Sequence, residues 1–217
     1  MKNKKIILSV VLCLSSASNA YCKNADEMSL GIKKAQDIWA EAKYVKTEKL
    51  EKIAEFEKCA QSAAELSKQF PQNAEPLIWQ GICTASQCEL LKLSALGKAK
   101  EAKAIFEKAA SMNDKALDGS AYTNLGVLYH RVPGWPIGFG DKKLAEENFQ
   151  KAVAIAPHNI DANYFYALFL IDEERYDEAK SRLNLALVAP SRNRPLADAK
   201  RKEEVAVAIS KLEKLQK

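Results

Sequence analysis

The fold of this chain is decided by the stretch IDANYFYALFLIDEERYDEAKSRLNLALVAP, residues 160–190. In its second half, Ala179, Leu183 and Ala186 follow at intervals of four and three residues, which places them on one face of a helix. Small residues let a helix approach its neighbour closely, and the larger residue between them fills the groove. Pro190 ends the helix, because proline has no backbone N–H and clashes with the preceding turn. The stretch predicts two packed helices.

The same pattern recurs twice upstream, at Ala102-Phe106-Ala109 and at Ala145-Phe149-Ala152. The last two copies lie 34 residues apart and the first two lie 43 apart. The sustained alternation of apolar and polar residues that is typical of strands is absent. A repeated helical unit with insertions is therefore expected.

This repeat resembles the tetratricopeptide repeat (TPR) family, whose unit is a helical hairpin with a period of 34 residues. In the last copy, Ala167 and Ala179 stand twelve residues apart, as in the family. In the middle copy, Gly126 and Ala145 are nineteen apart, so the hairpin turn holds seven extra residues. The resemblance implies an all-α fold, a right-handed α-solenoid of stacked helical hairpins with a C-terminal capping helix.

We expect one TPR-like helical-repeat domain over residues 21–217. Its expected parts are a degenerate N-terminal helix pair, three repeats and a capping helix, in residues 25–71, 74–114, 119–157, 160–190 and 195–216. Pro195 can begin the last helix, whose apolar residues would cover the exposed end of the stack.

Residues 1–20 have the layout of a secretory signal peptide. Three lysines precede the apolar run of residues 6–14, and small residues lead up to Ala20, after which we expect cleavage. The apolar run is shorter than the roughly 20 residues that span a bilayer. The chain is therefore expected to be bacterial and periplasmic, with secretion as a further possibility, and not membrane-embedded.

The basic character of the chain comes mostly from this segment. The sequence has 33 Lys and Arg against 28 Asp and Glu, and without the three lysines of residues 1–20 the count is 30 against 28. A nearly neutral chain with interspersed Lys and Glu reads as solvated helix faces, so nucleic-acid binding is not expected.

Four cysteines remain beyond residue 20, and an even number in an exported protein suggests disulfides. They are Cys22, Cys59, Cys83 and Cys88. On an unbroken helix, residues five apart have Cα atoms on the order of 8–9 Å apart, beyond the roughly 7 Å limit for a bridge. Cys59 lies level with Cys83 and Cys88 if the two helices around residues 70–76 run antiparallel. We expect Cys59 to pair with one of these two.

The loop VPGWPIGFGD, residues 132–141, interrupts the middle hairpin with three glycines and two prolines. We expect Trp135, Ile137 and Phe139 to be buried, because a flexible, solvated loop would not carry them. Two interpretations stay open: the loop packs its aromatic residues between adjacent hairpins, or it walls a ligand groove. Asp141 is expected to cap the next helix. The loop resembles a PGWPIGFGD-type loop of exported bacterial repeat proteins, which implies a shared structural device and no particular function.

In the TPR family, the first helices of the hairpins line the concave face. Matching by position implies these partner-binding residues: Thr123, Val127, His130, Arg131, Tyr164, Leu168 and Asp172, joined by Trp135 and Phe139 if the loop walls the groove. Arg131 could bind a carboxylate through two parallel hydrogen bonds, which suggests an acidic partner. The alternative is an ion pair of Arg131 with Asp172, Asp141 or Glu174.

No motif points to catalysis or to a metal. GxSxG, HExxH and CxxC are absent, and the two histidines, His130 and His158, lie far from the cysteines. We therefore expect no enzyme activity, no cofactor and no metal site.

The leading hypothesis is a non-enzymatic periplasmic module that binds a protein or peptide in its concave groove. The alternative is a small-ligand-binding or transport accessory protein resembling the T component of TRAP transporters. A closed apolar cavity near Trp135 would favour the alternative, whereas an open groove rich in Arg and Asn would favour peptide binding. The oligomeric state stays open.

Overall fold

The computed structural model describes residues 4–91 and 94–216, with the backbone alone for residues 4–23. Within these ranges the chain forms nine helices and no strand. They are α1 (Lys4–Tyr44), α2 (Lys49–Gln69), α3 (Glu75–Cys88), α4 (Ala95–Met112), α5 (Ala116–Arg131), α6 (Lys142–Ile155), α7 (Ile160–Asp172), α8 (Tyr176–Leu187) and α9 (Pro195–Leu215). The predicted signal peptide and Cys22 lie outside the described side chains.

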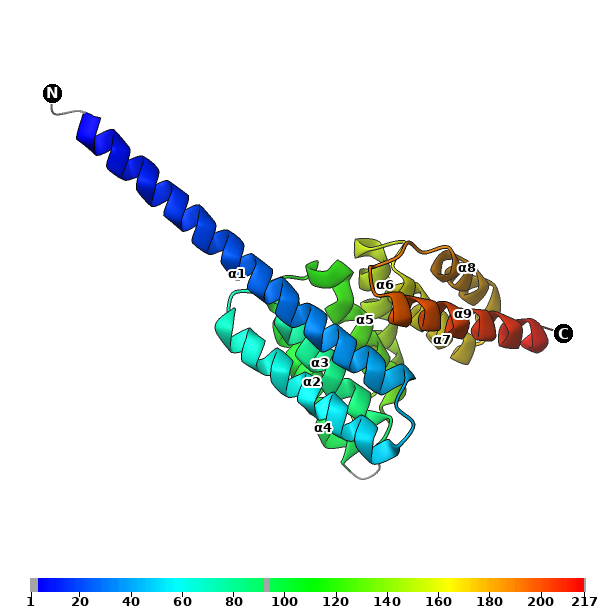
Figure 1. Ribbon diagram of the computed structural model, residues 1–217. Coiled ribbons are helices and arrows are strands. Elements are labelled where there is room, and N and C mark those ends of the chain that lie inside the picture. The colour runs from blue at the N-terminus through cyan, green and yellow to red at the C-terminus, as the bar shows by residue number, and fades with distance from the viewer. Residues whose placement is uncertain (1–3, 92–93, 217) are drawn as a thin grey trace.

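The helices stack as consecutive hairpins, α1–α2, α3–α4, α5–α6 and α7–α8 (Figure 1). Each first helix contacts the first helix of the next hairpin, so α1, α3, α5 and α7 form one row. The second helices, α2, α4, α6 and α8, form the other row. Each of α2, α4 and α6 also contacts the hairpin that follows, and α8 contacts α9. The predicted all-α solenoid of stacked hairpins is confirmed.

Glycines on the first helices let the two helices of a hairpin meet closely. A Cβ added at Gly126 of α5 would lie 2.7 Å from the ring of Phe149 on α6, and one added at Gly81 of α3 would lie 2.6 Å from the ring of Phe106 on α4. Both rings are fully buried. In these two hairpins a small residue of the first helix therefore packs against a large residue of the second, as predicted.

A disulfide joins Cys59 on α2 to Cys83 on α3, with Cα atoms 5.8 Å apart. It confirms that Cys59 pairs with one of the two cysteines on the neighbouring helix. Helix α3 continues unbroken through Cys83 to Cys88, which rules out a bridge between those two. Cys88 forms no disulfide with any cysteine whose side chain is described, and burial raises the pKa of its thiol to about 11.

Helix α9 begins at Pro195, packs against α7 and α8, and also contacts α1 at the other end of the stack (Figure 1). The first and last helices thus meet, and the row of first helices curves around an inner space. Among the described residues, no helix combines the length and apolar character needed to cross a membrane.

Candidate binding groove

A groove of about 1290 Å³ runs along the inner side of the row of first helices. Side chains of α1, α3, α5 and α7 line it on one side, and residues 190–194 with the start of α9 line it on the other. The groove therefore lies on the concave face on which partner binding was expected.

Helix α5 contributes a continuous stripe to this groove. Ser120, Asn124, Val127 and Arg131 follow at helical spacing and all line it, with buried Thr123 beside them. Tyr164 and Leu168 of the neighbouring helix α7 line it as well. Five of the residues expected at a partner site are therefore brought together here.

Arg131 is exposed, and among the described residues it forms no ion pair. The alternative expectation for this side chain, an ion pair with Asp172, Asp141 or Glu174, is wrong. Asp172 contacts His130 instead, and Asp141 caps α6 as expected, where its carboxylate accepts the Leu144 N–H at 2.9 Å. The guanidinium is left available inside the groove.

His130 and Asp172 lie beside the groove rather than in its lining. His130 Nε2 is 2.9 Å from Asp172 Oδ2, and the imidazole packs edge-on against Phe169 with ring centroids 5.4 Å apart. Burial and the nearby Arg131 lower the pKa of His130, partly opposed by Asp172. The pair connects α5 to α7, which is a structural role.

The loop of residues 132–141 departs from the expectation that its apolar residues are buried. Phe139 is half-buried and packs edge-on against Tyr129, with ring centroids 5.8 Å apart. Trp135 is 90% exposed and Ile137 is 70% exposed, so the prediction of burial is wrong for both. Trp135 and Phe139 do not line the groove, but Val132, Pro133 and Ile137 do.

Two tryptophans form an aromatic wall that the sequence did not reveal. Trp39 of α1 and Trp79 of α3 both line the groove, with ring centroids 6.2 Å apart in an edge-on arrangement. Trp39 Nε1 donates to the Ser86 hydroxyl at 2.8 Å, which fixes its orientation. Their contribution depends on how α1 packs against α3, which helical periodicity alone does not specify.

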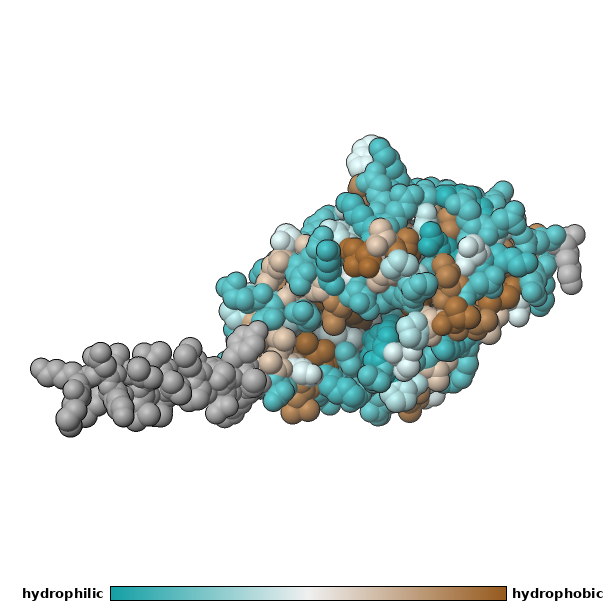
Figure 2. Space-filling model, turned by 90° about the horizontal axis from the view of Figure 1, so that it is seen from above, coloured by the Kyte–Doolittle hydropathy of each residue, from teal (hydrophilic) through white to brown (hydrophobic). Residues whose placement is uncertain are grey.

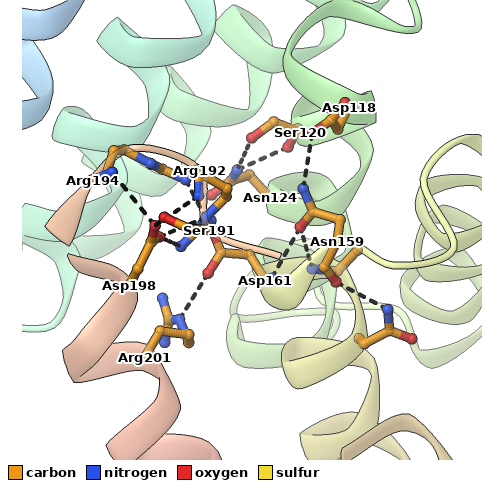
Figure 3. A network of polar contacts seen from close by, with 12 residues as sticks. Asp118, Ser120, Asn124, Asn159, Asp161, Ser191, Arg192, Arg194, Asp198 and Arg201 are labelled. Carbon is orange, nitrogen blue, oxygen red and sulfur yellow. Dashed lines mark hydrogen bonds and ion pairs between the residues drawn. The ribbon is translucent and has the colours of Figure 1, made fainter. Parts of the chain in front are cut away.

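A polar network closes one side of the groove (Figure 3). Asp161, at the start of α7, accepts from Arg201 Nε of α9 at 2.7 Å and from Arg192, and Arg194 lies 3.8 Å away. Asp198 in turn accepts from the backbone N–H of Arg192 at 2.8 Å. Burial alone would raise the pKa of Asp161, but Arg201, Arg192 and Arg194 together hold it well below its usual range. The network fastens α9 and residues 190–194 to α7.

Aromatic faces hold two of these arginines in place. Arg201 lies over Tyr164 and Phe165, with its guanidinium carbon 4.8 and 4.7 Å from the ring centroids. Arg194 lies 5.6 Å from the centroid of Trp79, so the strap of residues 190–194 reaches from α7 across to α3. Cation–π contacts of this kind add to the ion pairs where the site is partly desolvated.

A kink at the start of α5 places further polar side chains in the groove lining, near the Asp161 network. Leu117, Asp118 and Gly119 have positive φ values of 47°, 59° and 68°. A left-handed conformation costs an L-residue roughly 1–2 kcal/mol, so packing must hold this turn. Asp118 and Ser120 both line the groove, and Asn159 Nδ2 donates to Asp118 at 3.4 Å (Figure 3).

Among the described side chains, no group of three or more His, Cys, Asp or Glu is arranged to hold a metal ion. The groove brings together arginines, amides and aromatic rings, which recognise carboxylates and apolar side chains by hydrogen bonding and stacking.

Comparison with known proteins shows which proteins this chain is similar to. Residues 137–202 match the tetratricopeptide repeat family. The crystal structure of TTC0263, a thermophilic TPR protein in Thermus thermophilus, is similar with a TM-score of 0.57 and 14% identity, over 91% of this chain and 96% of that one. MamA 41-end from Desulfovibrio magneticus RS-1 is similar with a TM-score of 0.45 and 17% identity, over 86% and 95%.

Identities this low show the fold alone, and among curated proteins none matches the sequence of this chain. The family match and the shared fold together identify the chain as an all-α, TPR-like solenoid that carries a tetratricopeptide repeat match in residues 137–202.

Proposed function

We propose that this protein is a non-enzymatic interaction module that binds an acidic peptide segment of a partner protein in its concave groove. The observation that carries the proposal is Arg131, which lines the groove and forms no ion pair among the described residues. A guanidinium binds a carboxylate through two parallel hydrogen bonds, and such charge-assisted bonds are about twice as strong as neutral ones.

The size and walls of the groove also favour a peptide. Its volume of about 1290 Å³ exceeds the ~300–1,000 Å³ of pockets that hold small ligands. Trp39, Trp79 and Tyr164 line it, and aromatic residues are frequent hot spots at protein interfaces. Trp39 and Tyr164, which are half-buried, therefore offer apolar contact in the same groove as Arg131.

A closed apolar cavity near Trp135 would have favoured the alternative of a small-ligand or transport accessory protein. That side chain is 90% exposed and lines no part of the groove. The groove instead carries Arg131, Arg194 and Asn124, the composition that favours peptide binding.

The proposal includes export to the periplasm. The signal-like pattern of residues 1–20 supports it, and so does the disulfide between Cys59 and Cys83, because such bonds persist in oxidising compartments. Fractionation of the parent cells followed by intact-mass measurement tests this. We expect a periplasmic chain that begins at Tyr21, whereas a cytoplasmic chain that retains residues 1–20 would contradict it.

The binding proposal is tested with the purified protein and a peptide library in which one Asp or Glu is fixed and the flanks vary. We expect Arg131→Glu to weaken the selected peptides by at least about tenfold, since hydrogen bonds to charged groups contribute roughly 1.5–3 kcal/mol. Lys180 on α8 is exposed and lies outside the groove, so Lys180→Glu is the matched charge reversal and should change nothing.

The Trp135→Phe background sharpens the assay. In it the remaining tryptophans, Trp39 and Trp79, both line the groove and report its occupancy by fluorescence. Equal affinity of wild type and Arg131→Glu for acidic peptides would remove Arg131 from the site, and absence of binding to every peptide would end the proposal.

A further inference from the structure

The loop of residues 132–141 is held in one conformation by backbone contacts. Gly140 N–H donates to Pro133 O at 2.9 Å, which ties the end of the loop to its start, and Asp141 N–H donates to Tyr129 O at 3.0 Å, which ties it to the last turn of α5. A Cβ at Gly140 would lie 1.8 Å from Val132 O. Only glycine fits this close approach, and the loop is therefore a built structure rather than a solvated linker.

One aromatic side chain anchors the loop to the stack. Phe139 packs edge-on against Tyr129, and Lys103 Nζ lies 5.7 Å from the Phe139 ring centroid. Inside the loop, the backbone N–H groups of Ile137 and Gly138 both donate to Gly134 O at 3.1 Å. The anchored base and the closed turn fix the direction of the side chains between them.

The fixed turn directs two large apolar side chains outward. Trp135 is 90% exposed, more than any other exposed large apolar side chain of the described residues, and Ile137 is 70% exposed. On the face seen in Figure 2, hydrophilic side chains predominate and hydrophobic ones gather in patches. Single exposed apolar residues are ordinary, but a rigidly held tryptophan has the properties of an interface hot spot.

One of these two exposed side chains, Ile137, continues the groove. Arg131 is the last residue of α5, and Val132, Pro133 and Ile137 line the groove directly after it. A segment whose carboxylate binds Arg131 can therefore contact Ile137 within the groove, and Trp135 lies outside the lining, two residues before Ile137 in the same turn. The unpaired guanidinium and the apolar surface are parts of one path.

We infer that residues 132–141 form a second docking element at the mouth of the groove, which takes a large apolar side chain of the same acidic peptide that binds Arg131. This inference rests on the proposed function and adds the chemistry of the partner: a carboxylate with a Leu, Ile, Phe or Trp a few positions away. A rigid loop loses little conformational entropy when it binds, which favours such a contact.

The test uses four versions of one selected peptide, with the acidic residue kept or changed to its amide and the apolar residue kept or changed to Ala. We expect Trp135→Ala to weaken the acidic peptide with the apolar residue by about tenfold, the size of a moderate hot spot. It should leave the acidic peptide with Ala unchanged. Val188 is also exposed and lies outside the groove, so Val188→Ala is the matched control.

The outcomes separate this inference from the proposed function. If wild type binds none of the four peptides, the proposed function fails and this inference fails with it. If peptides bind and Arg131→Gln weakens them, but Trp135→Ala weakens all four equally or none, this inference alone is wrong. Loss of self-association or of binding to anionic lipid vesicles in Trp135→Ala, with peptide affinity unchanged, would assign the loop a different occupant and overturn it.

Discussion

Replacing Asp161 by Asn tests whether one carboxylate fastens α9 to the stack. Asp161 accepts from Arg201 at 2.7 Å and from Arg192, and these arginine side chains are only 7% and 16% exposed. Asparagine keeps the shape of the side chain and removes its charge. The change leaves buried guanidinium groups without their main counterion.

The expected loss of stability follows from this burial. Removing one partner of a buried ion pair costs about 3–5 kcal/mol, because the remaining charge is not compensated. The Asp161 side chain is 28% exposed, and Arg201 and Arg192 keep Glu204 and Asp198 as second partners, so we take the lower end, about 3 kcal/mol. For a chain of this size, each kcal/mol lowers Tm by about 2–4 °C, so the fall should be about 6–12 °C.

Thermal and urea unfolding at neutral pH measure this loss, with Asp37→Asn as the control. Asp37 forms an exposed ion pair with Lys33, and its removal should change stability by less than about 0.5 kcal/mol. Hydrogen exchange should rise in residues 190–204 of Asp161→Asn before the rest of the stack opens. A loss no larger than that of the control would refute the idea that the network fastens α9.

The Asp161 carboxylate also determines how the stability of the folded chain should change with pH. The arginines hold the folded pKa of Asp161 well below its usual range, so it binds protons more weakly in the folded chain than in the unfolded one. The stability that Asp161 contributes is therefore fully present above its pKa in the unfolded chain, about 3.9. It is lost as the pH falls towards and through its pKa in the folded chain. The difference between wild type and Asp161→Asn should stay constant from pH 7 to pH 5 and shrink only below about pH 4.

Three further predictions concern packing and cysteine chemistry. Gly126→Ala should destabilise by about 1–3 kcal/mol, because its methyl group would lie 2.7 Å from a buried ring, whereas Gly97→Ala, with nothing within 4 Å, should stabilise by up to about 1 kcal/mol in the same melts. Replacing Cys59 and Cys83 by Ser opens a loop with a sequence separation of 24 and should cost about 3.5 kcal/mol in urea unfolding; an unchanged midpoint would contradict this. The Cys88 thiol, with its pKa raised to about 11, should be alkylated at pH 8 roughly a hundredfold more slowly in the folded protein than in urea, as measured by peptide mass spectrometry.

The fold was readable from the sequence because each hairpin carries its own local signals. Alanines at helical spacing marked the packed faces, and Gly126 and Ala167 set the register from which the groove-lining residues of α5 and α7 were counted. Proline fixed the start of α9 at Pro195. Such signals depend on neighbours a few residues away, so they can be recognised without knowledge of the tertiary structure.

The other half of the groove was not readable, because it depends on how far the stack curves. Trp39 of α1 and Trp79 of α3 line the groove together because these two helices pack against each other, and Asp161 meets Arg201 across 40 residues of sequence. The only sequence signal was three arginines, at 192, 194 and 201, close to the start of a helix. This pattern indicates a basic cluster without indicating what it faces.

The prediction for the loop failed for a different reason. It treated Trp135 and Phe139 alike as apolar side chains that must be buried, and composition alone does not distinguish them. Phe139 lies close to Asp141, which is tied to Tyr129, whereas Trp135 lies in the turn closed by Gly134 and is exposed to solvent. Backbone geometry decided which aromatic residue is buried.

Arginines in this groove therefore divide into two groups by what they already contact. Arg192 and Arg201 are bound to Asp161 and are largely buried, so their substitution should lower stability whether or not a partner is present. Arg131 is exposed and forms no ion pair among the described residues, so its substitution should leave the melting temperature unchanged and act on binding alone. If Arg131→Gln instead lowered stability as much as Arg201→Gln, the guanidinium would already be occupied within the folded chain, and the argument for an acidic partner would lose its basis.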